Sequence, residues 1–227
     1  MRVGIVAEGR GDLGVLTRIL KGAIGVEEDD VDETDAHAMR AEQRGNWSRV
    51  IEECRDRARV RAFFEVPTDE TKLLVVQLDA AECALAGYDV ERPQAREPMR
   101  LCDRIERMLR GWMEDEYAEQ TCFAIALEET EAWVLPLYVA DADTTLIRDP
   151  KERLKNTLNR PNLFSDRERK RLFAKELGEY VRMREVAKGL ARRKGLDDCS
   201  GRNVSLRRFV ECLDACATAA RSSEQPE

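Results

Sequence analysis

Several patterns that define common functional classes are missing from this chain of 227 residues. It has one histidine, His37, which excludes zinc sites built on paired histidines and argues against a histidine-dependent serine or cysteine triad. No apolar run approaches the roughly 20 residues that a membrane-spanning helix needs. No positively charged start leads into an apolar segment, so no signal peptide is predicted and a cytoplasmic protein is expected.

The seven cysteines are scattered, odd in number and free of any C-x-x-C pair. Structural zinc needs clustered ligands, so the expected state is reduced thiols that are mostly buried. With 43% hydrophobic and 37% charged residues and only 7 prolines, the composition is typical of a globular protein. Only residues 218–227, which are small and polar, are expected to be disordered.

The net charge of −7 hides two regions of opposite sign. Residues 1–147 carry 18 Lys and Arg against 32 Asp and Glu, whereas residues 148–195 carry 16 against 7. A basic region beside an acidic metal site would suit a polyanionic substrate, and solvated helix faces are an equally good explanation. The dense acidic run at residues 27–35 is interpreted as a solvated loop in which a weak edge strand can lie.

Short apolar segments that alternate with helical patterns predict a mainly parallel sheet with helices on both faces. Strands are expected at residues 3–7, 73–78 and 121–127, and helices at residues 13–20, 47–64, 98–117 and 131–138. Pro136 should bend or stop the last of these helices. Beyond residue 149 only helices are expected, at about residues 150–159, 166–194 and 203–217. The predicted organisation is an α/β domain over residues 1–147, a basic helical extension over residues 148–217 that packs on it, and a tail.

Acidic residues stand where each predicted strand ends. They are Glu8, Asp79 and the group Glu128, Glu129 and Glu131, and Asp12 adds a carboxylate from the first turn of the first helix. The C-terminal ends of parallel strands share one edge of the sheet, so these acids are expected to converge there. Crowded carboxylates raise one another's pKa, and a hard cation such as Mg²⁺ relieves the repulsion. Which of the three acids after the third strand faces the site is left open.

The same residues resemble a known family. Glu8-Gly9 followed by Asp12 and Leu16, with an apolar strand that ends at Asp79, resembles the Toprim domain of topoisomerases, primases and OLD-type nucleases. Residues 129–133, 150–154 and 203–209 are similar to a bacterial Toprim-like family of unknown function, the DUF4276 group, whose members are often encoded beside ATPases in defence loci. The resemblance spans residues 3–213.

This resemblance implies a Toprim-like, Rossmann-like fold and a nuclease that uses Mg²⁺ or Mn²⁺ to hydrolyse DNA or RNA. It further implies a role in phage defence with an ATPase partner. Glu8 would be a general acid–base or a metal ligand, and Asp79 would be the first acid of the Toprim Asp-x-Asp motif. Asp12 corresponds to a second-metal acid of OLD-like proteins. Glu129 and Glu131 match the Glu-x-Glu-Ala-Trp acids, and Lys151 is the candidate cation for developing phosphate charge.

One position departs from the family pattern, because Ala81 stands where the second acid of the Asp-x-Asp motif belongs. Glu82 can replace that acid if the turn begins a helix; otherwise a metal position is lost. The departure favours an alternative, a non-catalytic Toprim-like module that binds nucleic acid or a protein. A third reading is a small-molecule phosphohydrolase or phosphotransferase.

Two further features have competing interpretations. Residues 9–14 match G-x-G-x-x-G at a strand-to-helix turn, the pattern of dinucleotide sites, although Glu8 and Asp12 would repel a pyrophosphate that arrived without a metal. The alternative is that the glycines only permit a tight turn. Trp133 is interpreted as a core aromatic, with base stacking as the alternative.

Overall fold

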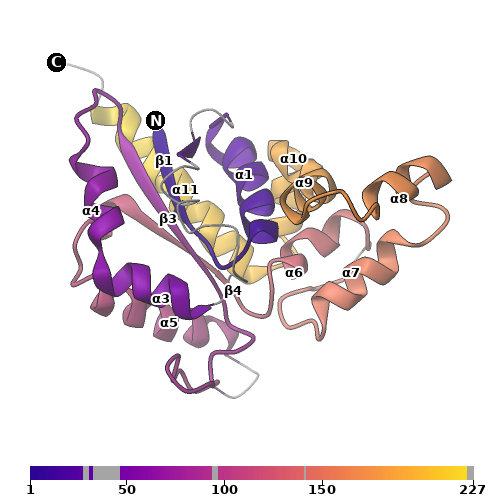
Figure 1. Cartoon of the computed structure of the whole chain (residues 1–227), viewed down its shortest axis with the longest axis horizontal. Coiled ribbons are helices and arrows are strands. Elements are labelled where there is room, and N and C mark those ends of the chain that lie inside the picture. Colours follow the sequence, from indigo (N-terminus) through magenta and orange to yellow (C-terminus); the bar gives the residue numbers. More distant parts are fainter. Residues whose placement is uncertain (28–30, 33–46, 94–96, 141, 224–227) are drawn as a thin grey trace.

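A computed structural model of the chain describes residues 1–27, 31–32, 47–93, 97–140 and 142–223 (Figure 1). His37 and most of the acidic run at residues 27–35 lie outside the described residues. The strands form one sheet in the order β2-β1-β3-β4, with every neighbouring pair parallel. Their bounds are β1 (Arg2–Val6), β2 (Val31–Asp32), β3 (Lys72–Asp79) and β4 (Thr121–Ala126). The two-residue β2 is the weak edge strand considered for the acidic run.

Helices make up most of the remaining described chain. Before residue 140 they are α1 (Arg10–Ile24), α3 (Trp47–Asp56), α4 (Ala58–Glu65), α5 (Pro98–Trp112), η2 (Ala118–Gln120), α6 (Glu131–Val134) and η3 (Leu135–Leu137). After it they are α7 (Pro150–Leu158), α8 (Asp166–Leu172), α9 (Glu179–Val186), η4 (Ala187–Ala191), α10 (Arg193–Ser200) and α11 (Val204–Ser223).

The sheet is buried on both faces, because alternate residues of its strands enter two separate cores. In β3, Leu73 and Val75 join the core formed with α1, α9, α10 and α11, whereas Leu74, Val76 and Leu78 join the core formed with α3, α4 and α5. Figure 1 shows these two groups of helices on opposite sides of the strands. The predicted α/β architecture, with a parallel sheet between helical layers, is confirmed.

The C-terminal helices are part of this architecture. Leu196 of α10 and Phe209 and Leu213 of α11 are fully buried in the same core as β4 residue Ala124. Asn203 caps α11 by accepting a hydrogen bond from the Leu206 amide at 3.1 Å, as expected for a helix that begins there. The α-helix after β4 ends at Val134, one residue before the 3₁₀ turn that contains Pro136, so the predicted stop is also confirmed.

Several predicted helix bounds are wrong, and the helix expected over residues 98–117 ends at Trp112. The helix expected over residues 47–64 is two helices, because Arg57 adopts a left-handed backbone with φ of 60° between α3 and α4. The helix expected over residues 166–194 is divided into α8, α9, η4 and the start of α10, and extended backbone at Arg192 separates the last two. Disorder is predicted from residue 218 onward, but α11 continues as a helix to Ser223.

None of the helices within the described ranges combines the length with the apolar composition that crossing a membrane requires.

Candidate metal centre

The acids Glu8 and Asp79 lie at neighbouring strand ends and are joined through Gln77. The amide of Glu8 donates to Gln77 Oε1 at 2.9 Å, and Gln77 Nε2 donates to Asp79 Oδ1 at 2.8 Å. The Asp79 amide in turn donates to Glu8 Oε1 at 2.5 Å. Because β1 and β3 are adjacent and parallel, the network fixes both carboxylates at the carboxyl edge of the sheet.

Asp12 reaches the same edge from the first turn of α1. Its Oδ1 accepts a hydrogen bond from the buried Thr130 hydroxyl at 2.5 Å, which links α1 to the segment after β4. Its Oδ2 lies close to Gly9, the residue that precedes the helix, where an added Cβ would stand 3.0 Å away. Gly9 therefore leaves room for the Asp12 carboxylate at the turn.

The three acids after β4 divide into two groups. Glu128 turns away, because both of its carboxylate oxygens accept hydrogen bonds from Arg92, the closer at 2.9 Å. Glu129 and Glu131 lie close enough to the other acids that the charge of each raises the pKa of Asp79. The amide of Lys151, at the start of α7, donates to Glu129 Oε2 at 3.3 Å. The question left open by the sequence is thus answered in favour of Glu129 and Glu131.

Burial and mutual repulsion perturb the two strand-end acids. Burial raises the pKa of Glu8 from its ordinary 4.5 to about 8; the hydrogen bond from the Asp79 amide opposes this rise, and the charges of Asp12, Glu82 and Glu129 add to it. Burial also raises the pKa of Asp79 well above its usual range, and the charges of Asp12 and Glu8 add to this rise. Both carboxyl groups therefore favour the protonated form unless a cation joins them.

The pKa values of Asp12 and Glu131 are shifted in the same direction but less. Burial raises the pKa of Asp12 to about 6 against the opposing effects of the Thr130 hydrogen bond and the Lys151 charge. Burial and the charge of Asp12 raise the pKa of Glu131 to about 7. At Lys151, burial lowers the pKa but the surrounding carboxylates, Glu131 first, raise it by more, so the ammonium stays charged. Lys151 therefore supplies positive charge beside the acids.

The position of the missing motif acid is exposed. Ala81 and Glu82 lie in the turn that follows β3, and neither belongs to a helix. The charge of Glu82 nevertheless contributes to the raised pKa of Glu8. Glu82 thus stands close enough to act on the site electrostatically, while its own side chain is exposed to solvent.

The acids do not form a compact cluster of metal ligands. Within the described residues, no three carboxylate groups bring an oxygen atom each within 4.8 Å of one another. Mg²⁺ keeps several of its waters and is usually bound through one or two carboxylates, and as the side chains stand no more than two of these carboxylates would hold one ion.

The glycine-rich turn is covered by α9. An added Cβ on Gly11 would lie 3.3 Å from Cγ of Glu179, and one on Gly14 would lie 2.6 Å from the backbone oxygen of Tyr180. The second and third glycines of the G-x-G-x-x-G match therefore permit close packing of α1 against α9. This role differs from both sequence-based interpretations, a dinucleotide site and a tight strand-to-helix turn, because the close contact is with a helix far away in the sequence.

Several residues of the site are not among the sequence candidates. Gln77 and Thr130 organise the acids, Glu179 of α9 raises the pKa of Asp12, and Arg92 removes Glu128 from the group. Of these residues, only Gln77 could have been singled out from the sequence, because it is the one polar residue in the apolar run at residues 73–78. Trp133 is fully buried and donates to Ser205 Oγ at 2.9 Å, so it is a core aromatic and does not offer a stacking surface.

Fold and site together define a class: an α/β protein with a crowded acidic site at the carboxyl edge of a parallel sheet. Comparisons with family models, with curated protein sequences and with solved structures each found no match to this chain. The Toprim resemblance therefore rests on the residues quoted for it above.

Proposed function

We propose that this chain is a Mg²⁺-dependent nuclease with a Toprim-like fold that hydrolyses phosphodiester bonds of DNA or RNA. The observation that carries the proposal is the group of partly buried acids Glu8, Asp12 and Asp79 at one edge of the sheet, whose pKa values are all raised in the absence of a cation. The Toprim resemblance of the sequence adds a bacterial defence role, an ATPase partner and a cytoplasmic location to the same proposal.

The donor set fits a hard divalent cation. In each of Glu8, Asp12 and Asp79, one carboxylate oxygen accepts a hydrogen bond from the protein, which orients the group and leaves the second oxygen for an ion. Glu129 and Glu131 provide further oxygen ligands at the same edge. When bound, Mg²⁺ would neutralise phosphate charge and orient the attacking water.

Two protein groups can assist directly. Glu8 could act as a general acid–base if it does not bind the ion; its pKa is raised to about 8 by burial in the metal-free site, and a bound cation would lower it. Lys151 keeps its positive charge beside the acids and can stabilise developing charge on a phosphate.

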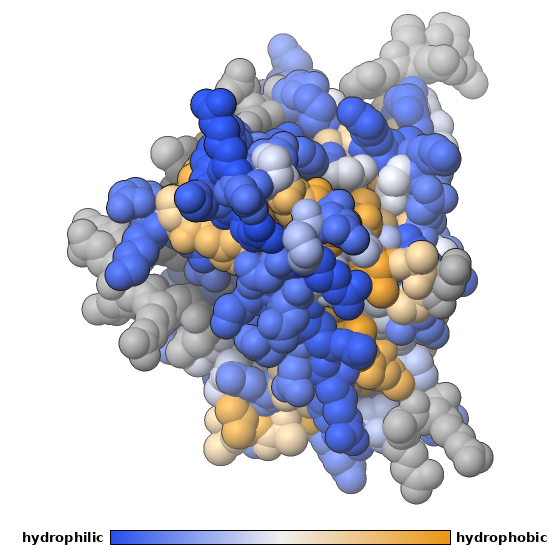
Figure 2. All heavy atoms as spheres, turned by 90° about the vertical axis from the view of Figure 1, so that its right-hand side faces the viewer, coloured by the Kyte–Doolittle hydropathy of each residue, from blue (hydrophilic) through white to orange (hydrophobic). Residues whose placement is uncertain are grey.

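The helical region that begins beside the acids is rich in basic residues. Helix α7 begins at Pro150, next to the acids, and α8 carries Arg167, Arg169, Lys170 and Arg171. Figure 2 faces this side of the molecule, which is mostly hydrophilic with small apolar patches. The excess of basic over acidic residues in the region of residues 148–195, which contains α7 beside the acids, supports a nucleic acid substrate.

The rival proposal is a non-catalytic binding module, and the residue at position 81 favours it. Ala81 supplies no ligand, and the neighbouring Glu82 is solvent-exposed. If the remaining acids hold an ion too loosely to position a water, the site would bind phosphate groups without cleaving them. The small-molecule phosphohydrolase remains a third proposal and would not depend on substrate length.

The decisive experiment is cleavage of plasmid DNA, single-stranded DNA and structured RNA in Mg²⁺, Mn²⁺ or EDTA. Glu8→Gln and Asp79→Asn should each lower a metal-dependent rate by about 100-fold or more, because each removes a charged group at the reacting centre. Glu152→Gln, which neutralises an exposed acid next to Lys151 in α7, is the matched control and should leave the rate unchanged.

Binding of the ion is measured independently of cleavage. Mg²⁺ should raise the melting temperature of the wild type, and Asp79→Asn should reduce that rise. Cutting that survives both substitutions contradicts the proposed site. Absence of cutting with salt-sensitive binding of nucleic acid supports the rival module, and cleavage confined to small phosphate esters supports the third proposal.

A further inference from the structure

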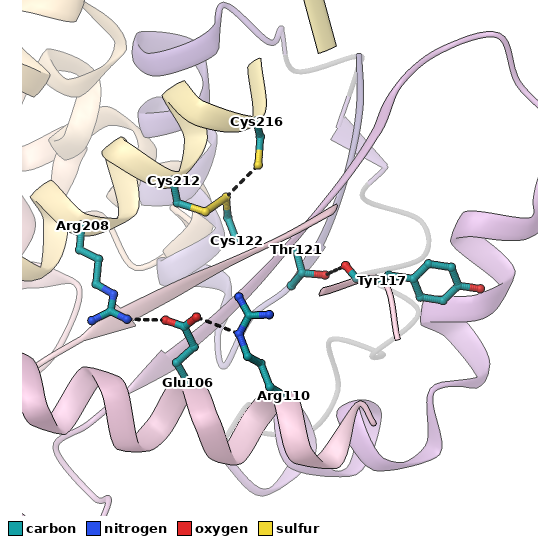
Figure 3. Close-up of a disulfide and its surroundings, with 8 residues drawn as sticks. All are labelled: Glu106, Arg110, Tyr117, Thr121, Cys122, Arg208, Cys212 and Cys216. Carbon is teal, nitrogen blue, oxygen red and sulfur yellow. Dashed lines mark hydrogen bonds and ion pairs between the residues drawn. A yellow bond between two sulfur atoms is a disulfide. The ribbon is translucent and has the colours of Figure 1, made fainter. Parts of the chain in front are cut away.

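Three cysteines that are far apart in the sequence meet at the opposite end of the sheet from the acids. Cys122 and Cys212 form a disulfide between β4 and α11, and Cys216 Sγ lies 3.7 Å from Cys122 Sγ. The three sulfur atoms all lie within 4.8 Å of one another. Figure 3 shows Cys212 and Cys216 on the same helix, both directed toward Cys122. The prediction that all cysteines are reduced is therefore wrong for this pair.

Helix periodicity explains why one strand cysteine can meet two helix cysteines. Residues four apart lie on the same face of an α-helix, roughly one turn from each other. Cys212 and Cys216 have this spacing in α11, which packs against β4. The Cα atoms of Cys122 and Cys212 are 6.0 Å apart, within the range that a disulfide spans.

We propose that Cys122, Cys212 and Cys216 form a thiol–disulfide exchange site in which Cys122 pairs alternately with the two cysteines of α11. The thiolate of Cys216 attacks Sγ of Cys122, the bond to Cys212 breaks, and Cys212 leaves as a thiolate that takes up the proton Cys216 gave up. One disulfide replaces another, so the exchange consumes neither oxidant nor reductant. When the protein starts fully reduced, a small-molecule disulfide accepts the two electrons.

The surroundings assign different roles to the three thiols. Cys122 is fully buried, whereas Cys212 and Cys216 are half-buried and can meet small thiols and disulfides from solvent. Burial raises the pKa of Cys216, and the charge of Glu119 adds to this rise, so the attacking thiolate is scarce at neutral pH and exchange is slow there. A binding site for a soft metal ion is a less well supported explanation for the three sulfur atoms, because the disulfide uses two of them and no fourth described residue joins the group.

Cys212→Ser provides the direct test. In a buffer of reduced and oxidised glutathione, this variant should form a Cys122–Cys216 disulfide, and Cys216→Ser should form only Cys122–Cys212. Free thiols are alkylated before digestion, and linked fragments are identified by mass spectrometry. Cys212 and Cys216 fall in one tryptic peptide, so a protease that cleaves before Asp214 is used to separate them.

Wild-type protein is mapped in parallel at mildly alkaline pH, where exchange is faster. A minor fraction of Cys122–Cys216 links is expected there, and Cys122→Ser provides the background. The proposal is overturned if Cys122 and Cys216 of the Cys212→Ser variant both stay alkylatable while Cys216→Ser oxidises completely. It is equally overturned if Cys212→Ser fails to fold and the wild type contains no Cys122–Cys216 link above background.

Discussion

At the scale of single residues, Gln77 is the side chain on which the order of the acidic site depends. Gln77→Met keeps the volume but removes both the acceptor of the Glu8 amide and the donor to Asp79. A buried amide left without a partner costs about 1–3 kcal/mol, so we expect a loss of that size in the free energy of unfolding, measured by urea titration. The affinity for Mg²⁺ should fall as well, because Asp79 loses the contact that orients it.

Gln120 is the matched control for that substitution. Its side chain is exposed, and Gln120→Met should change the free energy of unfolding by no more than about 0.5 kcal/mol. Equal effects of the two substitutions would contradict the structural role of Gln77.

The candidate acids could be predicted from the sequence because each stands at the end of a recognisable strand. Glu8 and Asp79 follow apolar runs, and the parallel topology then brings them together. That Glu128 turns away from the other acids could not be predicted, because this depends on its hydrogen bonds with Arg92, which is 36 residues away in a segment without regular structure. Neither could the disulfide be predicted, because 90 residues separate Cys122 from Cys212 and no spacing rule connects them.

At the scale of elements, the packing of α1 against α9 depends on a glycine. An added Cβ on Gly14 would stand 2.6 Å from the Tyr180 backbone oxygen, so Gly14→Ala must push the two helices apart. We expect a loss of about 1–3 kcal/mol in the free energy of unfolding, even though alanine favours helix by about 1 kcal/mol.

Gly111 tests the same substitution without the contact. It lies in α5, and an added Cβ there would meet nothing within 4 Å. Gly111→Ala should therefore be neutral or stabilise the protein by up to about 1 kcal/mol. Thermal and urea unfolding of both variants measure the difference, and a stabilising Gly14→Ala would contradict the close approach.

Strands were easier to predict than helix boundaries in this chain, for a physical reason. The segment over residues 73–78 is apolar except for Gln77, since the sheet is covered on both faces, and such a run has few alternatives to a strand. The helical pattern over residues 166–194 indicates only that helix is favoured locally. Where the helix is interrupted depends on packing that a periodic pattern does not show. For example, Gly189 packs closely against the side chain of Leu137, and Gly195 packs closely against the backbone oxygen of Gly189.

At the scale of the whole molecule, the crowded acids make stability depend on pH. Glu8 has a pKa of about 8 in the folded protein against an ordinary 4.5, so the folded state holds more protons than the unfolded state between these values. Folding stability must then fall as pH rises through this interval. The raised pKa values of Asp79 and Glu131 act in the same direction.

For metal-free protein, the melting temperature should therefore decrease between about pH 5 and pH 8, by roughly 2–4 °C for each kcal/mol of stability lost. Glu8→Gln removes one of the titrating groups and should flatten this dependence, whereas the exposed control Glu152→Gln should not. Calorimetric scans in EDTA across this range test both statements. A melting temperature that rises with pH in the wild type would show that these acids are ionised without a cation. Addition of Mg²⁺ should reverse the trend, because an ion that binds the carboxylates stabilises the folded state most where they would otherwise repel one another, at the alkaline end of the range.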